Sequence, residues 1–507
     1  MKEYDVNPIT KTDYPDPDVI RVDDIYYMVS TTMYFFPGCA ILRSYDLIHW
    51  EVASYVYESL DDTPGERLEH ESVDYGQGMW AATLRYHNGK FYVAFPSFAT
   101  KTTYLFTAED VCGEWTKSTI EGYYHDLSLL FDDDGRVFIT YGNMEIHLLE
   151  LDENLKGPKP GGVNKAIIKD DPSKVGLGYE GSHFYKINGR YYVFLIDWPK
   201  ESGIRTQNCF VSDTVDGEYT GGPVFSCTRG FRNAGVAQGG IVDTPNGKWY
   251  SIMFQDSGAV GRIPVIVPVR FEKGFPVFGI NGKVPEKIEI TSSRPYYRYE
   301  PLYTSDNLKG KLGLQWQWNH VCDSSLVTID EENGLSIKTD KLCVNVTHAK
   351  NTLTQRMMWP RCEAEVTVDG SLLNEGDVAG ICALQSHYGL VGITKIGGCY
   401  YLVNIVRDNL ENCFKIGASD FMPGTLADQV RLKGPKVTLC LKAVFEENVD
   451  KSAFFYLNEG KFVKIGTPHD LRFTLDHFTG ARFGLFVYST KEIGGVASFT
   501  DFVYRYG

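Results

Sequence analysis

The sequence has little of what membrane-spanning, secreted or disulfide-stabilised proteins need. No run approaches the eighteen apolar residues of a membrane span, and the first residues lack the apolar core of a signal peptide. The 11 cysteines include no Cys-x-x-Cys pair, and their odd number favours reduced thiols over a disulfide framework. We therefore expect a cytoplasmic protein without membrane contact, unless a leader has been removed.

Positive charge and helical periodicity are also scarce. The chain of 507 residues carries 50 Lys and Arg against 65 Asp and Glu, a net charge of −15, which argues against nucleic acid and other polyanionic partners. A neutral ligand fits this charge better. Long helical patterns are missing, and the runs between turns are short and rich in Val, Ile, Tyr and Phe. These features indicate an all-β chain.

What the sequence does contain is a β-hairpin signal that occurs five times. In residues 178–194 an Asn-Gly turn at Gly189 separates two aromatic strands, which is the strongest copy. Related turns centre on Ile25, Gly89, Gly135 and Gly247, at a spacing of roughly 45 to 65 residues that is typical of four-stranded blades. We predict a five-bladed β-propeller over residues 1–297.

The last two hundred residues follow a different pattern. The repeat stops in an aromatic, proline-containing segment, for which we predict a linker at 298–307. Longer alternating strands then appear, such as 364–368, 437–445 and 481–488. They predict a β-sandwich of the jelly-roll type over residues 308–507.

One position recurs nine residues before each turn position. The five copies of the repeat place Asp16, Trp80, Asp126, Glu180 and Gln238 there. First strands of propeller blades line the central axis, so we expect the three acids to meet in the first strands at that axis. Grouping carboxylates is costly because like charges oppose one another's ionisation, which favours chemistry over a structural purpose. Two acids are the minimum for glycoside hydrolysis, and a third keeps the proton donor protonated.

Simpler interpretations exist for each of these residues. Asp16 lies between prolines, where a turn role is common, and Asp126 and Glu180 could be solvated strand residues. Trp80 could fill core, and a hydrogen-bonded inner-strand amide is the default for Gln238. The shared position in the repeat favours the functional interpretation for the acids.

Several motifs, taken in order, resemble a known family. They are Tyr14-Pro15-Asp16-Pro17, Phe36-Pro37-Gly38, Trp80-Ala81-Ala82-Thr83, Asp126-Leu127-Ser128-Leu129, Glu180-Gly181-Ser182-His183 and Gly261-Arg262. The chain resembles glycoside hydrolase family 43, whose members are five-bladed propellers that cleave β-D-xylosides and α-L-arabinofuranosides with inversion. Its second half is similar to the concanavalin-like sandwich of the β-xylosidase members.

The resemblance implies a role for each acid. Asp16 matches the general base, Glu180 the general acid, and Asp126 the third acid that keeps Glu180 protonated and orients it. Arg262 would bind substrate hydroxyls and help keep Asp16 ionised. Trp80 would form a wall of the sugar pocket.

Two positions depart from the family pattern. Met33 stands where xylosidases of the family usually place a phenylalanine against the terminal sugar, and we expect it in the pocket together with Phe36. Gln238 replaces a histidine that helps several members hold a central calcium. The resemblance therefore implies no required cofactor and no metal-ligating residue, and it leaves open a structural calcium at the propeller axis and a homo-oligomer.

The sequence predicts an inverting exo-glycosidase that releases xylose or arabinofuranose from plant cell-wall oligosaccharides. Among enzymes, the alternatives are an arabinan-cleaving member or a retaining fructan-type hydrolase, although the latter would show Asn-Asp-Pro-Asn-Gly and Glu-Cys instead of the motifs around Asp16 and Glu180. From another class, a propeller that binds carbohydrate without turnover is the alternative.

Overall fold

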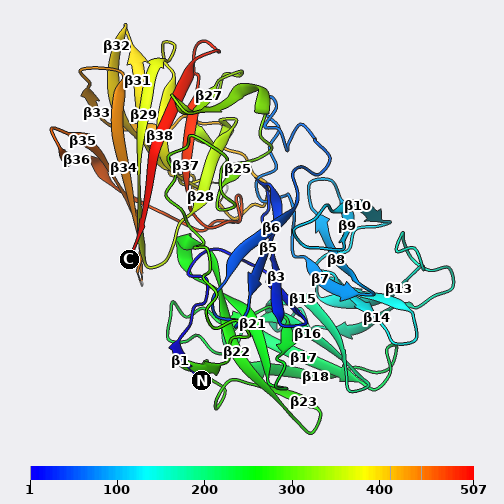
Figure 1. Cartoon of the computed structure of the whole chain (residues 1–507). Coiled ribbons are helices and arrows are strands. Elements are labelled where there is room, and N and C mark those ends of the chain that lie inside the picture. The colour runs from blue at the N-terminus through cyan, green and yellow to red at the C-terminus, as the bar shows by residue number, and fades with distance from the viewer. Residues whose placement is uncertain (1, 412, 447) are drawn as a thin grey trace.

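The computed structural model describes residues 2–411, 413–446 and 448–507. Strands and three single-turn 3-10 helices make up the regular structure of these residues, so the expected all-β fold is confirmed. Figure 1 shows two domains, with the N-terminal one at lower right and the C-terminal one at upper left. Within the described residues, no helix is long and apolar enough to cross a membrane.

The N-terminal domain is the expected five-bladed propeller. Each blade is an antiparallel sheet whose strands follow one another along the chain, and in blade 5 the innermost strand is split in two. The blade strands are β2 (Asp18–Val22), β3 (Ile25–Ser30), β5 (Gly38–Ser44) and β6 (Glu51–Tyr57); β7 (Thr83–His87), β8 (Lys90–Ser97), β9 (Thr102–Ala108) and β10 (Thr116–Ile120); β11 (Ser128–Phe131), β12 (Val137–Tyr141), β13 (Glu145–Leu151) and β14 (Asn164–Lys169); β15 (Val175–Ile187), β16 (Arg190–Pro199), β17 (Thr206–Ser212) and β18 (Thr220–Phe225); and β19 (Val236–Ala237), β20 (Ile241–Asp243), β21 (Trp249–Asp256), β22 (Arg262–Glu272) and β23 (Phe275–Phe278). A separate pair, β1 (Lys2–Asp5) with β24 (Lys287–Ile290), joins the two ends of the domain.

The predicted hairpin turns connect the first strand of each blade to the second. In blade 4, Ile187 pairs with Arg190 across Asn188 and Gly189, whose φ angles are 51° and 79°. Asn88 and Gly89 in blade 2 have φ angles of 50° and 79°. Two consecutive positive φ angles are the signature of a type I′ turn, which an Asn-Gly pair adopts with little strain.

The C-terminal domain is a sandwich of two antiparallel sheets. One sheet contains β33 (Thr425–Arg431), β32 (Cys399–Val406), β31 (Gly389–Ile396), β30 (Val378–Leu384), β37 (Arg482–Tyr488), β28 (Thr352–Arg356) and β25 (Gln317–Asn319), in that order. The other contains β26 (Val327–Asp330), β27 (Gly334–Lys338), β38 (Val496–Tyr506), β29 (Arg361–Leu372), β34 (Lys436–Glu446), β35 (Val449–Asn458) and β36 (Lys461–Asp470). The 3-10 helices are η1 (Gly258–Val260) in blade 5, and η2 (Ser324–Leu326) and η3 (Val346–His348) in the sandwich.

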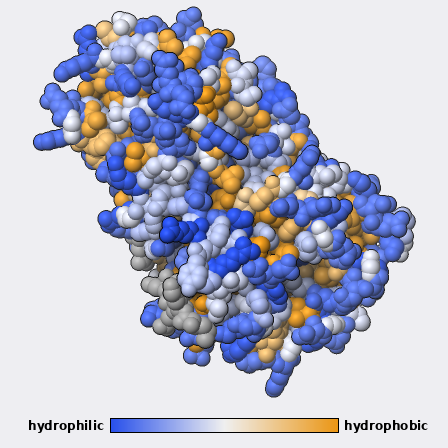
Figure 2. Space-filling view, viewed as in Figure 1, coloured by the Kyte–Doolittle hydropathy of each residue, from blue (hydrophilic) through white to orange (hydrophobic). Residues whose placement is uncertain are grey.

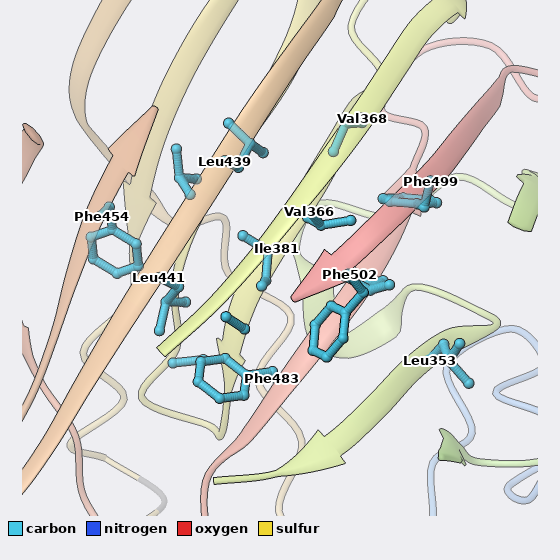
Figure 3. Packing of buried hydrophobic residues seen from close by; sticks show 14 of the residues in the cluster. Leu353, Val366, Val368, Ile381, Leu439, Leu441, Phe454, Phe483, Phe499 and Phe502 are labelled. Carbon is cyan, nitrogen blue, oxygen red and sulfur yellow. The ribbon is translucent and has the colours of Figure 1, made fainter. Parts of the chain in front are cut away.

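Apolar side chains from both sheets fill the space between them. Figure 3 shows Val366 and Val368 of β29 beside Ile381 of β30 and Phe483 of β37, and all four are fully buried. Inward-facing residues alternate with polar ones along β29, as expected for a strand with one face on the core. Ala259, Val260 and Ile263 of blade 5 also belong to this cluster, so the propeller contributes to the core of the sandwich.

The two domains are joined by more than a linker. A two-residue strand in blade 1, β4 (Phe35–Phe36), pairs with β25 and becomes the edge of the larger sandwich sheet. Buried Asp13 accepts hydrogen bonds from the backbone N–H groups of Arg262 (2.7 Å) and Gly480 (2.8 Å), which lie in different domains. Figure 2 shows apolar residues gathered where the domains meet. These contacts hold the sandwich loops against the propeller.

Candidate active site

Three of the five recurring residues lie at the ends of the inner strands, where the backbone departs from strand geometry. Asp16, Asp126 and Gln238 have φ angles of 51°, 49° and 57°, in the left-handed region. Asp16 and Asp126 each precede their inner strand by two residues, and Gln238 separates β19 from β20. The expectation that these residues lie within the first strands of their blades is therefore wrong, because a residue with left-handed backbone interrupts the hydrogen-bond ladder of a strand.

Glu180 reaches a comparable place by a different route. It lies within β15, where the register with β16 shifts on both sides of it. The next residue, Gly181, has a φ of 65°, which glycine adopts without strain. Such bulges re-aim a side chain.

The recurring residues surround one cavity of about 580 Å³. Seven of the eight predicted site residues line it: Asp16, Met33, Trp80, Asp126, Glu180, Gln238 and Arg262. A cavity of this volume accommodates a small ligand. Its lining includes residues of the sandwich, so the second domain forms part of the site.

Phe36 is the predicted site residue that the structure does not bring to the cavity. Its side chain is buried against Tyr57, with a ring-centroid distance of 5.9 Å, in a core cluster of the propeller. Its backbone pairs with Trp318 of β25. Phe36 therefore joins the two domains, while Met33, three residues earlier, lines the cavity.

Asp16 is held by two donors. Its Oδ1 accepts a hydrogen bond from Nη1 of Arg262 (2.8 Å), and its Oδ2 accepts one from the hydroxyl of Thr31 (2.7 Å). The side chains of Asp16 and Arg262 are both buried. One cationic and one neutral donor thus fix the orientation of the Asp16 carboxyl group.

Arg262 uses only some of its side-chain N–H donors in the hydrogen bond to Asp16. Its Nε and Nη2 are buried and find no hydrogen-bond partner among the described residues. Its guanidinium lies 4.6 Å from the ring centre of Phe478 and 5.2 Å from that of Phe254. Buried N–H groups without partners are costly, so these two point to a ligand or water in the cavity.

Asp126 and Glu180 form a second acidic group with His125. The Oδ2 of Asp126 accepts a hydrogen bond from the N–H of Gly181 (3.0 Å). Burial raises the pKa of Asp126 to about 7; the charges of Glu180 and Asp16 act in the same direction, and His125 opposes them. A proton is therefore retained in this group at neutral pH.

Sequence reasoning missed several residues of the cavity. His125, Tyr123 and Asn143 come from blade 3, and Trp198 and Arg205 from blade 4. His125 precedes a predicted catalytic acid, and that adjacency could have identified it. Ile416, Leu475 and Phe478 come from sandwich loops outside the repeat, so no periodic signal in the sequence points to them.

The propeller axis below the cavity contains an arginine. Arg85 donates to Oδ2 of Asp18 (2.7 Å), to the hydroxyl of Ser128 (2.8 Å) and to the carbonyl of Phe184 (3.3 Å). Arg85 and His183 outweigh the effect of burial and hold the pKa of Asp18 well below its usual range. The guanidinium of Arg85 thus already neutralises Asp18, whereas calcium prefers several oxygen ligands around it.

Three carboxyl groups around one cavity, one of them with a pKa raised to about 7, are equipped for acid–base cleavage of a glycosidic bond. Taken with the comparisons below, they identify the protein as a glycoside hydrolase. Residues 6–276 match the family described as Glycosyl hydrolases family 43, and residues 306–505 match the beta-xylosidase C-terminal concanavalin A-like domain. The chain belongs to glycosyl hydrolases family 43.

Individual relatives extend over most of the chain. A beta-xylosidase of Formosa agariphila is 26% identical over 99% of this chain and 90% of its own length. A non-reducing end alpha-L-arabinofuranosidase of Bacteroides ovatus is 28% identical, covering 80% of this chain and 78% of its own. A solved structure of a bifunctional GH43-CE protein from Bacteroides eggerthii is 37% identical with a TM-score of 0.90, and the match covers 99% of this chain and 63% of that protein.

Proposed function

We propose that the protein is an inverting exo-glycosidase that releases xylose or arabinofuranose from plant cell-wall oligosaccharides. The observation that carries the proposal is the pairing of Asp16 with Arg262 and Thr31 in the same cavity as Glu180. Relatives named for β-xylosidase and α-L-arabinofuranosidase activities support this substrate class.

In the proposed reaction, Asp16 takes a proton from a water molecule. That water attacks the anomeric carbon while Glu180 protonates the departing glycosidic oxygen, so the configuration inverts. An inverting geometry needs room for the water, and we expect the two carboxyl groups to stand about 6.5 to 9.5 Å apart. Asp126 lies beside Glu180 and accepts from the N–H of Gly181, the residue after the acid, and the free donors of Arg262 bind sugar hydroxyls.

Hydrolysis of aryl β-xylosides and aryl α-arabinofuranosides, followed by NMR, tests the activity and its stereochemistry. We expect the first product to have the inverted anomeric configuration. Retention of configuration would contradict the assignment of Asp16 as base, and carbohydrate binding without turnover would favour the non-catalytic alternative.

The variant Glu180→Gln tests the acid. We expect it to reduce kcat by about 100-fold or more for a poor leaving group and far less for an activated one, because only the poor leaving group needs the proton. Glu109→Gln, at an exposed position after β9, is the matched control and should behave as the unmodified enzyme. Equal losses on both leaving groups would remove Glu180 from the role.

We also propose that the enzyme needs no calcium at its propeller axis. Arg85 supports this because it donates to groups in three neighbouring blades, a cross-linking role that an axial ion would otherwise fill. Gln238 supports it as well, because its backbone N–H donates to Oε1 of Gln207 (2.7 Å) and its side chain packs against Gly181.

A further inference from the structure

The described residues hold the proposed acid, Glu180, through only one of its two carboxyl oxygens. Its Oε2 lies 3.2 Å from Nε2 of His125 and also accepts a hydrogen bond from Nδ2 of Asn143. A carboxylate oxygen has two lone pairs, and these two donors use both. Among the described residues, none donates to Oε1. The proton for a leaving group therefore belongs on Oε1.

His125 is itself fixed in place. Its carbonyl accepts a hydrogen bond from the N–H of Gly142 (2.9 Å), and its ring makes an edge contact with Trp80 at a centroid distance of 5.4 Å. Its Nε2 also lies 3.7 Å from Oδ2 of Asp126. Because Nε2 faces two carboxyl groups that accept hydrogen bonds, it is the nitrogen that carries a proton.

From this geometry we propose that His125 and Asn143 are positioning residues for Glu180, which they hold by Oε2 so that Oε1 alone delivers the proton. We propose further that His125 holds Oε2 as an imidazolium. The inference rests on the proposed role of Glu180 as the acid, and nothing in the family resemblance assigns a role to His125.

The charged groups around His125 determine whether its imidazole is protonated. The carboxyl groups of Asp16, Asp126 and Glu180 face it, and the cavity also contains the guanidinium groups of Arg205 and Arg262 and the phenol of Tyr123. Burial lowers the pKa of His125, but the acids outweigh burial and raise it to about 9. The imidazole is thus cationic at neutral pH.

The imidazolium of His125 makes a charge-assisted hydrogen bond to Oε2 of Glu180. A bond of this kind holds the carboxyl group in one orientation more firmly than a neutral donor would.

The variant His125→Gln separates charge from geometry because glutamine offers an N–H donor without a charge. We expect kcat on a poor leaving group to stay within about tenfold of the unmodified enzyme, because the neutral donor still holds Oε2 of Glu180. His125→Phe removes the donor as well, and should lose activity on poor leaving groups far more than on activated ones.

His87→Gln is the matched control, since His87 lies at the turn between β7 and β8 and stacks on Phe131 (4.3 Å between ring centres). A loss on poor leaving groups in His125→Gln as large as that in His125→Phe would overturn the role of the N–H donor. Equal losses on both classes of leaving group in His125→Phe would overturn the positioning role.

A titration of the histidine side chains by NMR needs no turnover and therefore separates this inference from the proposed function. The His125 signal, identified by its loss in His125→Gln, should remain that of the imidazolium to above pH 8 and should titrate at lower pH in Glu180→Gln. A midpoint near the ordinary histidine value of 6.5 in the unmodified protein would overturn the inference even if glycosides are hydrolysed.

Discussion

At the scale of single residues, the site concentrates arrangements that folding alone would avoid. Five residues that line the cavity have left-handed backbone, which costs a non-glycine residue about 1 to 2 kcal/mol: Asp16, Met33, Asp126, Gln238 and Phe478. Two further features add to this: Asp126 is buried beside other acids, and two N–H groups of Arg262 lack partners among the described residues. Such local strain is typical of sites that bind and react, and it predicts that relieving it will stabilise the protein.

The substitution Asp126→Asn tests whether relieving one of these costs stabilises the protein at the expense of activity. The folded-state pKa of Asp126, about 7, lies above its ordinary value of 3.8, so the carboxyl group binds protons more tightly in the folded protein. Its contribution to stability is therefore present below about pH 4 and is lost as the pH rises to about 7. We expect Asp126→Asn to raise the melting temperature at pH 8 but not at pH 4, while reducing kcat on poor leaving groups.

Thermal unfolding of both proteins across this pH range measures the effect. Asp133→Asn, at an exposed position in the hairpin turn of the same blade, is the control and should shift the melting temperature similarly at both pH values. A stabilisation by Asp126→Asn that is independent of pH would argue against a carboxyl group that is costly to ionise.

Among the strands, β15 contains both a copy of the repeated hairpin and a bulge that places the proposed acid, Glu180. The hairpin pattern predicted β15, β16 and the turn between them correctly, because an Asn-Gly turn and alternating side chains are local signals. It did not predict that β15 extends back to Val175 or bends at Glu180. At the bend, Gly181 lies close to Gln238 of another blade, and a hairpin pattern contains no information about that neighbour.

The substitution Gly181→Ala tests the bulge. A β-carbon there would lie 2.7 Å from Cγ of Gln238, on backbone with a φ of 65°. We expect a lower melting temperature and a loss of kcat of about tenfold or more, because Glu180 would move with its neighbour. Gly189→Ala is a close control: its φ is 79°, but open space surrounds the position. It should show only the backbone strain of about 1 kcal/mol and normal kcat. Equal kcat in both variants would contradict a positioning role for the bulge.

In the complete molecule, the propeller blades and the loops of the sandwich domain together form the site. The sequence predicted five blades, a sandwich and the grouping of three acids, because equivalent offsets in a repeat become equivalent places in a propeller. It could not predict Phe478 or Leu475 in the cavity, since contacts between non-repeating loops and another domain leave no periodic pattern. It also misplaced Phe36, whose motif position does not reveal that β4 pairs with the sandwich.

The axial arginine gives a prediction at this scale. We expect a chelator to leave the melting temperature unchanged, whereas Arg85→Met should lower it by several degrees, since removing one partner of a buried ion pair costs about 3 to 5 kcal/mol. Added calcium should not rescue the variant. Arg136→Met, which removes an exposed arginine paired with Asp134, is the control. A melting temperature that falls with chelator in the unmodified protein would show that a bound metal stabilises it.

The short strand β4 has one more consequence. Because Phe35 and Phe36 belong to a propeller loop yet complete a sandwich sheet, cutting the chain between the domains would leave the edge of β25 exposed and ready to pair with other chains. A chimaera that placed this sandwich on a foreign propeller would need the same dipeptide at the same height above the blades. The two halves of the enzyme are therefore expected to be inherited and exchanged together.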